Sequence, residues 1–137
     1  MRVVGVGLVG LGNVGTGTLT VLADNAGQIA TKLGFPLKVV AVCSRSVKSK
    51  TLPEAFHGVQ RTTDWREVVT HPEVDIVAEL IGGAGVAAEV IEAAIRNHKS
   101  VVTANKELMA LRGTEIWDLA ISGGVNLAME EIGRAHV

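Results

Sequence analysis

Residues 3–15 read VVGVGLVGLGNVG, a short apolar run that ends in three glycines with the spacing G-x-G-x-x-G. The β-branched run predicts a strand over Val3–Leu8, and the more polar sequence that follows predicts a helix over 14–33. A strand that turns on glycine directly into a helix begins a strand–helix–strand unit, whose two strands are parallel and joined by a right-handed crossover. This stretch therefore predicts an α/β fold.

The same alternation of strand and helix continues along the chain. The expected strands are continuously apolar, which is typical of a parallel sheet covered on both faces. The fold class is therefore α/β: a Rossmann-type doubly wound parallel sheet in three layers, αβα, within one domain over residues 1–130. The remaining predicted segments are strands over Leu37–Cys43, Asp75–Leu80, Ser100–Thr103 and Val125–Met129, helices over 85–97 and 105–121, and a short helix around Asp64–Thr70 capped by Thr62 or Thr63.

Composition narrows the classes of function. The 137 residues carry a formal net charge of −1, which argues against electrostatic binding of nucleic acid or of an anionic membrane. The single cysteine, Cys43, excludes an internal disulfide and a multi-cysteine zinc site, and we expect it to be a packing residue rather than a nucleophile. We expect no metal, no membrane span and a cytoplasmic location.

The glycine turn predicts a dinucleotide site, because it follows the first strand and opens a long helix. Gly10 would make the tight turn, Gly12 would let the backbone approach a pyrophosphate, and Gly15 would allow close packing of helix on strand. Free N–H groups at the helix start would hold the phosphates. The alternative is that these glycines only permit tight packing, a role we expect for Gly5, Gly7 and Gly17.

The end of the second strand indicates which dinucleotide is preferred. NAD-specific domains usually place an acidic residue there, whereas this chain has Ser44 and Arg45. A guanidinium and small hydroxyls suit a 2′-phosphate, which favours NADP over NAD, with Arg45 as the main contact. The alternative is a solvated basic loop.

Two later strands end on the same, ligand-binding edge of the predicted sheet. After the third apolar strand, Glu79, Ile81 and Gly82 fall near the expected cofactor; Glu79 either orients a sugar hydroxyl or a lysine, or is a solvated strand end. After the next strand, Asn105 is a good helix N-cap, which puts Lys106 in the first helical turn. The helix dipole opposes a cation there, which favours an anionic or polar ligand nearby. The alternative is a surface lysine on a loop.

The motifs GLVGLGNVGTG, VDIVAELIGG, VVTANKELMA, the following Gly113 and GVNLAMEE occur in an order that resembles the cofactor domain of homoserine dehydrogenase. The discriminating motif is TANK, because G-x-G-x-x-G is shared by many dehydrogenases. The resemblance implies interconversion of L-homoserine and L-aspartate 4-semialdehyde with NAD(P), in the threonine and methionine branch of the aspartate pathway. It implies a catalytic Lys106 beside the nicotinamide, which holds the substrate oxygen or relays its proton. The cofactor-binding residues that the resemblance implies are Gly10, Gly12, Asn13, Val14, Gly15, Arg45, Thr103, Ala104 and Lys106. The positions of Ser44, Ile81 and Gly82 after their strands add these three residues to the predicted cofactor site.

The chain departs from the family pattern at its end. The family continues into a substrate-binding and dimerising region with a second catalytic lysine, and that region is missing after residue 130. Residues 131–137 end in IGRAHV, which matches one translated frame of a widely used sequencing adapter. We expect a non-native tail at 131–137, a fragment that is inactive by itself, and a longer natural protein that forms homo-oligomers.

Two other functions stay open at this level. Another semialdehyde or amino-acid dehydrogenase would use the same nucleotide domain, but it predicts a nucleophilic cysteine in the later loops. A regulatory module that senses NAD(H) without catalysis would have little use for Lys106.

Overall fold

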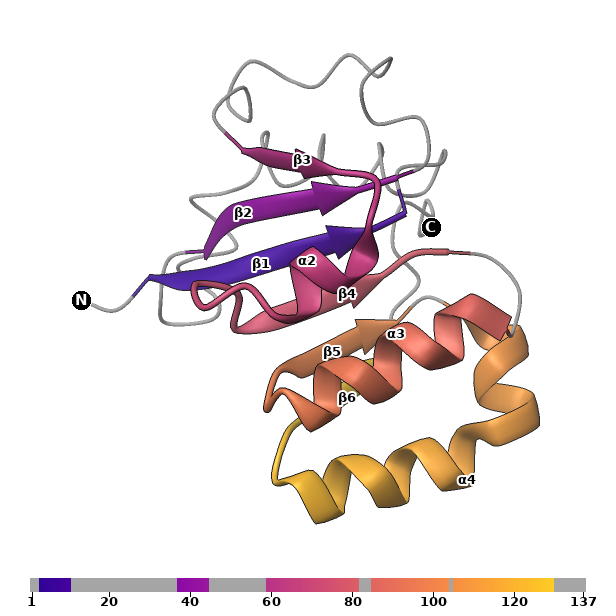
Figure 1. Ribbon diagram of the computed structural model, residues 1–137. Helices are drawn as coiled ribbons and strands as arrows, with labels where there is room; N and C mark the ends of the chain where they lie inside the picture. The colour runs from indigo at the N-terminus through magenta and orange to yellow at the C-terminus, as the bar shows by residue number, and fades with distance from the viewer. Residues whose placement is uncertain (1–2, 11–36, 45–58, 82–84, 104, 130–137) are drawn as a thin grey trace, which may run out of the picture.

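The computed structural model describes residues 3–10, 37–44, 59–81, 85–103 and 105–129 of the chain (Figure 1). The helix expected over 14–33 lies outside these ranges. Among the described residues, none of the helices combines the length and apolar character that a membrane crossing requires.

The described strands form one six-stranded sheet in the order β3-β2-β1-β4-β5-β6, and every neighbouring pair is parallel (Figure 1). The order runs outward from β1 in both directions, which is the doubly wound arrangement. The predicted fold class is therefore confirmed. The strands are β1 (Val4–Val9), β2 (Leu37–Cys43), β3 (Gln60–Thr62), β4 (Ile76–Glu79), β5 (Ser100–Thr103) and β6 (Leu127–Met129).

Three helices are described: α2 (Trp65–Val69), α3 (Gly85–Arg96) and α4 (Lys106–Gly123). Asn105 caps α4 as predicted, because its side chain accepts a hydrogen bond from the N–H of Leu108. The predicted cap of α2 was wrong. Asp64 occupies that position and accepts from the N–H of Arg66, while the Thr62 hydroxyl donates to the carboxylate of Glu67.

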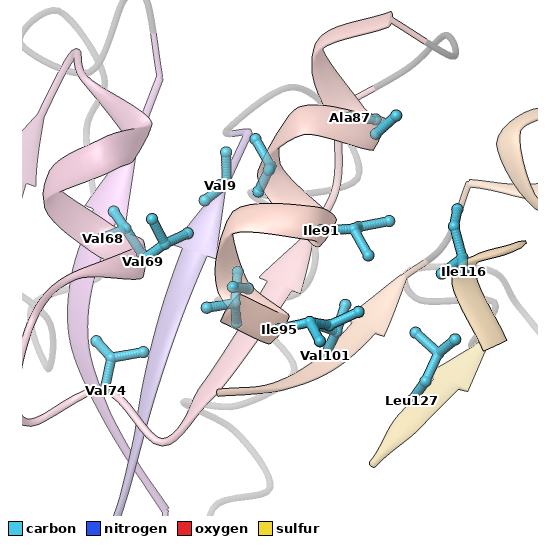
Figure 2. Packing of buried hydrophobic residues seen from close by; sticks show 14 of the residues in the cluster. Val9, Val68, Val69, Val74, Ala87, Ile91, Ile95, Val101, Ile116 and Leu127 are labelled. Atoms are coloured by element: carbon cyan, nitrogen blue, oxygen red, sulfur yellow. The ribbon is translucent and has the colours of Figure 1, made fainter. Parts of the chain in front are cut away.

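The core lies between one face of the sheet and these helices (Figure 2). In the parallel register, Val77 is paired with Val101, and Val101 with Leu127, so their side chains share this face and pack with residues of the helices such as Ile91. The opposite face is buried as well, since Leu8 is fully buried there. Burial on both faces explains why the strands read as continuous apolar runs.

Gly7 lets α2 pack directly on β1. A Cβ atom at this position would lie 2.4 Å from Cγ1 of Val68, which is too close for two carbon atoms. The predicted packing role of Gly7 is therefore confirmed, and the same holds for Gly5, where a Cβ would lie 1.8 Å from the carbonyl oxygen of Glu73.

Candidate functional site

The carboxyl ends of β1, β4 and β5 meet at one edge of the sheet. Val9 pairs with Glu79, and Glu79 pairs with Thr103, so three consecutive strands end level with one another. The strand order reverses between β1 and β4, and ligands of open α/β sheets bind in the crevice outside the carboxyl ends at such a reversal.

Gly10 turns the chain directly after β1. Its φ of +103° is strained for any residue with a side chain, and its N–H donates to the carbonyl of Cys43 at 2.7 Å. A Cβ here would lie 2.9 Å from the carbonyl carbon of Leu80, so the backbone after β4 passes close to the turn. These constraints fit the tight glycine turn that a pyrophosphate site requires.

Glu79 is the last residue of β4 and is fully buried, with 0% of its side chain surface exposed. Its Oε1 accepts a hydrogen bond from Oγ1 of Thr103 at 2.6 Å, and its Oε2 accepts from the N–H of Ile81 at 2.8 Å. The alternative of a solvated strand end was therefore wrong.

Burial raises the pKa of the Glu79 carboxyl above its ordinary value, because it removes water from the charged form. Hydrogen bonds from Thr103, from the N–H of Ile81 and from Asn105 favour the charged form and oppose this effect. The net direction is upward. Glu79 is therefore a buried, hydrogen-bonded carboxyl group within the sheet edge, and not a charged group at the surface.

Lys106 is the first residue of α4, and its side chain is exposed. The preceding Asn105 is buried; its N–H donates to Oγ1 of Thr103 at 3.0 Å and its Nδ2 donates to the carbonyl of Ile81 at 3.2 Å. The start of α4 is thus bound to the ends of both β4 and β5, and it presents a lysine at the same edge as the Gly10 turn.

The end of β2 reaches this edge too. Ser44 follows β2, and its N–H donates to the carbonyl of Thr62 at 3.2 Å. Cys43 is buried beneath it, and burial, with smaller effects from Asp64 and Glu67, raises the pKa of the thiol to about 11. A thiol in this state is a poor nucleophile, in agreement with the predicted packing role.

Comparison with known proteins identifies this arrangement. A family model described as the NAD binding domain of homoserine dehydrogenase matches residues 10–130. The chain belongs to the homoserine dehydrogenase family.

Relatives and solved structures agree with this assignment. Homoserine dehydrogenase of Pseudomonas aeruginosa is 43% identical over 130 residues, which cover 95% of this chain and 29% of the relative. The corresponding protein of Neisseria gonorrhoeae is 41% identical over 132 residues, again covering 95% of this chain and 29% of the relative. A crystal structure of a homoserine dehydrogenase from Thiobacillus denitrificans superimposes with a TM-score of 0.85 at 44% identity, covering 94% of this chain and 30% of that one.

The chain thus spans about 29% of the length of these homoserine dehydrogenases. What it shares with them is the dinucleotide domain, so a nicotinamide dinucleotide is the cofactor that the domain is built for. The predicted family and the predicted cofactor class are confirmed.

The predicted site residues of this homoserine dehydrogenase domain fall into two groups. Those in the described part of the chain gather at the carboxyl edge: Gly10, Ser44, Ile81, Thr103 and Lys106. The others lie outside the described residues: Gly12, Asn13, Val14, Gly15, Arg45, Gly82 and Ala104. The binding and catalytic roles of both groups remain predictions.

The sequence did not predict that Glu79, Thr103 and Asn105 form one hydrogen-bonded group. The signal available was a carboxylate at the end of an apolar strand, which needs a polar partner if buried. Its partner Thr103 lies 24 residues away in the chain, and only the parallel pairing of β4 with β5 brings the two side chains together.

Proposed function

We propose that this domain is the cofactor-binding part of an enzyme that interconverts L-homoserine and L-aspartate 4-semialdehyde, in the biosynthesis of threonine and methionine. The observation that carries the proposal is the position of Lys106, in the first turn of α4 and at the same sheet edge as the Gly10 turn. A nucleotide sensor without catalysis has no need for a cation there, where the helix dipole opposes it.

The division of labour in this proposal follows from the chemistry. The nicotinamide ring, when bound, supplies the hydride acceptor. The Gly10 turn would bring the backbone close to the pyrophosphate, and the backbone at Thr103 and Ala104 would face the nicotinamide side. Lys106 would hold the substrate hydroxyl oxygen, or take up its proton, as the adjacent carbon loses hydride. In the reverse direction the same group would return the proton to the carbonyl oxygen.

We further propose that the cofactor is NADP. The support comes from the sequence at one position: Ser44 and Arg45 follow β2, where an acidic residue would favour NAD. A guanidinium can form paired, charge-assisted hydrogen bonds with a 2′-phosphate.

The cofactor proposal is tested by titrating the purified chain with NADPH and, separately, with NADH, and measuring binding from the change in cofactor fluorescence. We expect NADPH to bind about tenfold more tightly than NADH, and Arg45→Glu to remove that difference. Arg66→Glu is the matched control: it reverses an exposed arginine on α2 and should leave the ratio of affinities unchanged. Equal affinities in the unsubstituted chain would contradict the NADP proposal.

The catalytic proposal needs the complete enzyme. Because the relatives are more than three times as long, we propose that this piece alone binds cofactor without oxidising homoserine, and that the complete protein is a homo-oligomer whose remaining region supplies the substrate pocket. In the complete enzyme, Lys106→Ala should lower kcat about a hundredfold or more while leaving the affinity for NADPH within about threefold. A variant with unchanged kcat would favour a different role for Lys106.

A further inference from the structure

Both oxygens of the Glu79 carboxylate are engaged within the protein. Oε1 accepts from the Thr103 hydroxyl and Oε2 from the N–H of Ile81, and the side chain has no exposed surface. A direct hydrogen bond from Glu79 to a ribose hydroxyl would require one of these bonds to break. The geometry therefore points away from a cofactor contact and toward a role within the edge itself.

The hydrogen bonds continue from Glu79 to the start of α4. The Thr103 hydroxyl, which donates a hydrogen bond to Glu79, also accepts one from the N–H of Asn105 at 3.0 Å. The Asn105 side chain accepts the N–H of Leu108 at 3.0 Å through Oδ1, and it donates to the carbonyl of Ile81 at 3.2 Å through Nδ2. These bonds close a circuit from the end of β4, through β5 and the helix cap, back to β4.

We propose that Glu79 is a positioning residue, whose carboxylate acts through Thr103 and Asn105 to hold the first turn of α4 and so fixes Lys106 at the cofactor edge. The purpose of this arrangement rests on the function proposed above. The positioning itself does not, because it is a statement about how the helix start is held.

The hydrogen-bond partners of Glu79 explain why a carboxylate, and not an amide, occupies this position. The groups that face the carboxylate, from Thr103, Ile81 and Asn105, are all donors; the Thr103 oxygen already accepts the N–H of Asn105, so its own hydrogen is directed at Glu79. An amide in place of the carboxylate offers one acceptor and one NH₂ group, so it leaves one donor facing another donor. A buried group of this kind is costly to leave unsatisfied, and Glu79→Gln should loosen the circuit without removing volume.

Amide hydrogen exchange on the purified chain, measured by NMR, tests the proposal. In Glu79→Gln we expect the amides of Ile81, Asn105 and Leu108 to exchange about tenfold faster, while that of Val101, inside β5, keeps its rate. Thr103→Val removes only the hydroxyl that links Glu79 to Asn105. It should accelerate amide exchange at Asn105 and Leu108, but leave the Ile81 amide protected by its hydrogen bond to Oε2 of Glu79. The matched control is Glu89→Gln, which makes the same chemical change at an exposed position on α3 and should alter none of these rates.

The affinity for NADPH gives a second readout. We expect Glu79→Gln and Thr103→Val to weaken binding about fivefold, because a loosened circuit no longer holds the backbone of Ile81 and Thr103 in place at the proposed cofactor site. Ile91→Val, a buried substitution on α3, lowers global stability without touching the edge and should leave the affinity unchanged.

The outcomes separate the two proposals. Unchanged exchange at Asn105 and Leu108 in Glu79→Gln, or acceleration of every amide including Val101, overturns the positioning role. Failure of the unsubstituted chain to bind either NADPH or NADH overturns the proposed function, and the exchange pattern still decides the positioning role. If Glu79→Gln does not fold, the contrast between Ile81 and Asn105 in Thr103→Val decides it alone.

Discussion

Glu79 and Thr103 are register partners at the ends of β4 and β5, both fully buried, and their side chains are joined by a hydrogen bond of 2.6 Å. The pairing puts a carboxyl group inside the sheet edge, at the position where the ends of two strands and the start of α4 converge. Its ionisation is therefore coupled to the stability of that edge.

This coupling predicts a pH dependence of stability. Burial raises the pKa of Glu79, so the folded state favours its neutral form more than the unfolded state does. The resulting contribution to stability is fully present below the ordinary carboxyl pKa of about 4.3 and is lost as the pH rises through the raised value of the folded state. The free energy of unfolding of the unsubstituted chain, minus that of Glu79→Gln, should therefore decrease as the pH increases. Urea unfolding of both proteins from acid to neutral pH measures this difference, and an increase would contradict it.

The contact between β1 and α2 predicts strong coupling between Gly7 and Val68. Gly7→Ala introduces a Cβ that would lie 2.4 Å from Cγ1 of Val68, and we expect it to cost about 1–3 kcal/mol. Val68→Ala removes that methyl group and should cost about 2 kcal/mol by itself. The double variant should be more stable than the sum of the two costs indicates, by about 1 kcal/mol. Urea unfolding of the four proteins completes the cycle, and strict additivity would show that α2 shifts away instead.

The C-terminus of α3 predicts a stabilising substitution. His98 has a φ of +60°, its N–H donates to Ile95, and the N–H of Lys99 donates to Ala94, so the helix ends in a Schellman motif with histidine in the left-handed position. Glycine adopts this conformation without strain, and His98→Gly should raise stability by about 1 kcal/mol. Thermal unfolding followed by circular dichroism would detect this gain.

The matching position at the end of α4 provides the control for that substitution. Gly124 has a φ of +69° and its N–H donates to Ile121, while the N–H of Val125 donates to Ala120. Gly124→Ala should therefore lower stability by about 1 kcal/mol, opposite in sign to His98→Gly. A stabilising effect of Gly124→Ala would mean that the cap is not left-handed in solution.

Cys43 should resist alkylation in the folded chain. Raising the thiol pKa from 9.0 to about 11 leaves about one hundredth as much thiolate at neutral pH, and burial slows access further. We expect iodoacetamide at pH 8 to modify the native chain at least about a hundredfold more slowly than the urea-unfolded chain. Mass spectrometry at timed intervals measures both rates; rapid labelling of the native chain would place Cys43 at the surface.

The central strands could be predicted from sequence because their burial leaves a direct trace in composition. Leu37–Cys43 and Ser100–Thr103 were predicted with the observed bounds, since an apolar run covered on both faces has clear ends. β3 was missed. Its Gln60 and Arg61 are polar and exposed, and the strand exists because Gln60 pairs with Ala41 on β2, a contact that local sequence does not reveal.

The site was predictable where one residue acts through local geometry. Asn105 as a cap and Lys106 in the first turn follow from a few adjacent residues. The prediction of the α2 cap failed because Thr62, Thr63 and Asp64 are all residue types that cap helices well. Which of them caps the helix depends on which side chain is hydrogen-bonded to another group, as Thr62 is to Glu67. The burial of Glu79 could not be predicted for a related reason, since its hydrogen-bond partner Thr103 belongs to a different strand.

The position of β1 in the sheet has a consequence during translation. Of the strands that the structure describes, β1 is translated first, yet it pairs with β2 on one side and with β4 on the other. A nascent chain that has not yet reached Glu79 therefore carries an apolar strand with one open edge, and such edges recruit other chains. We expect ribosome-bound chains that stop before β4 to need chaperone protection, and chains that extend past it to close the centre of the sheet.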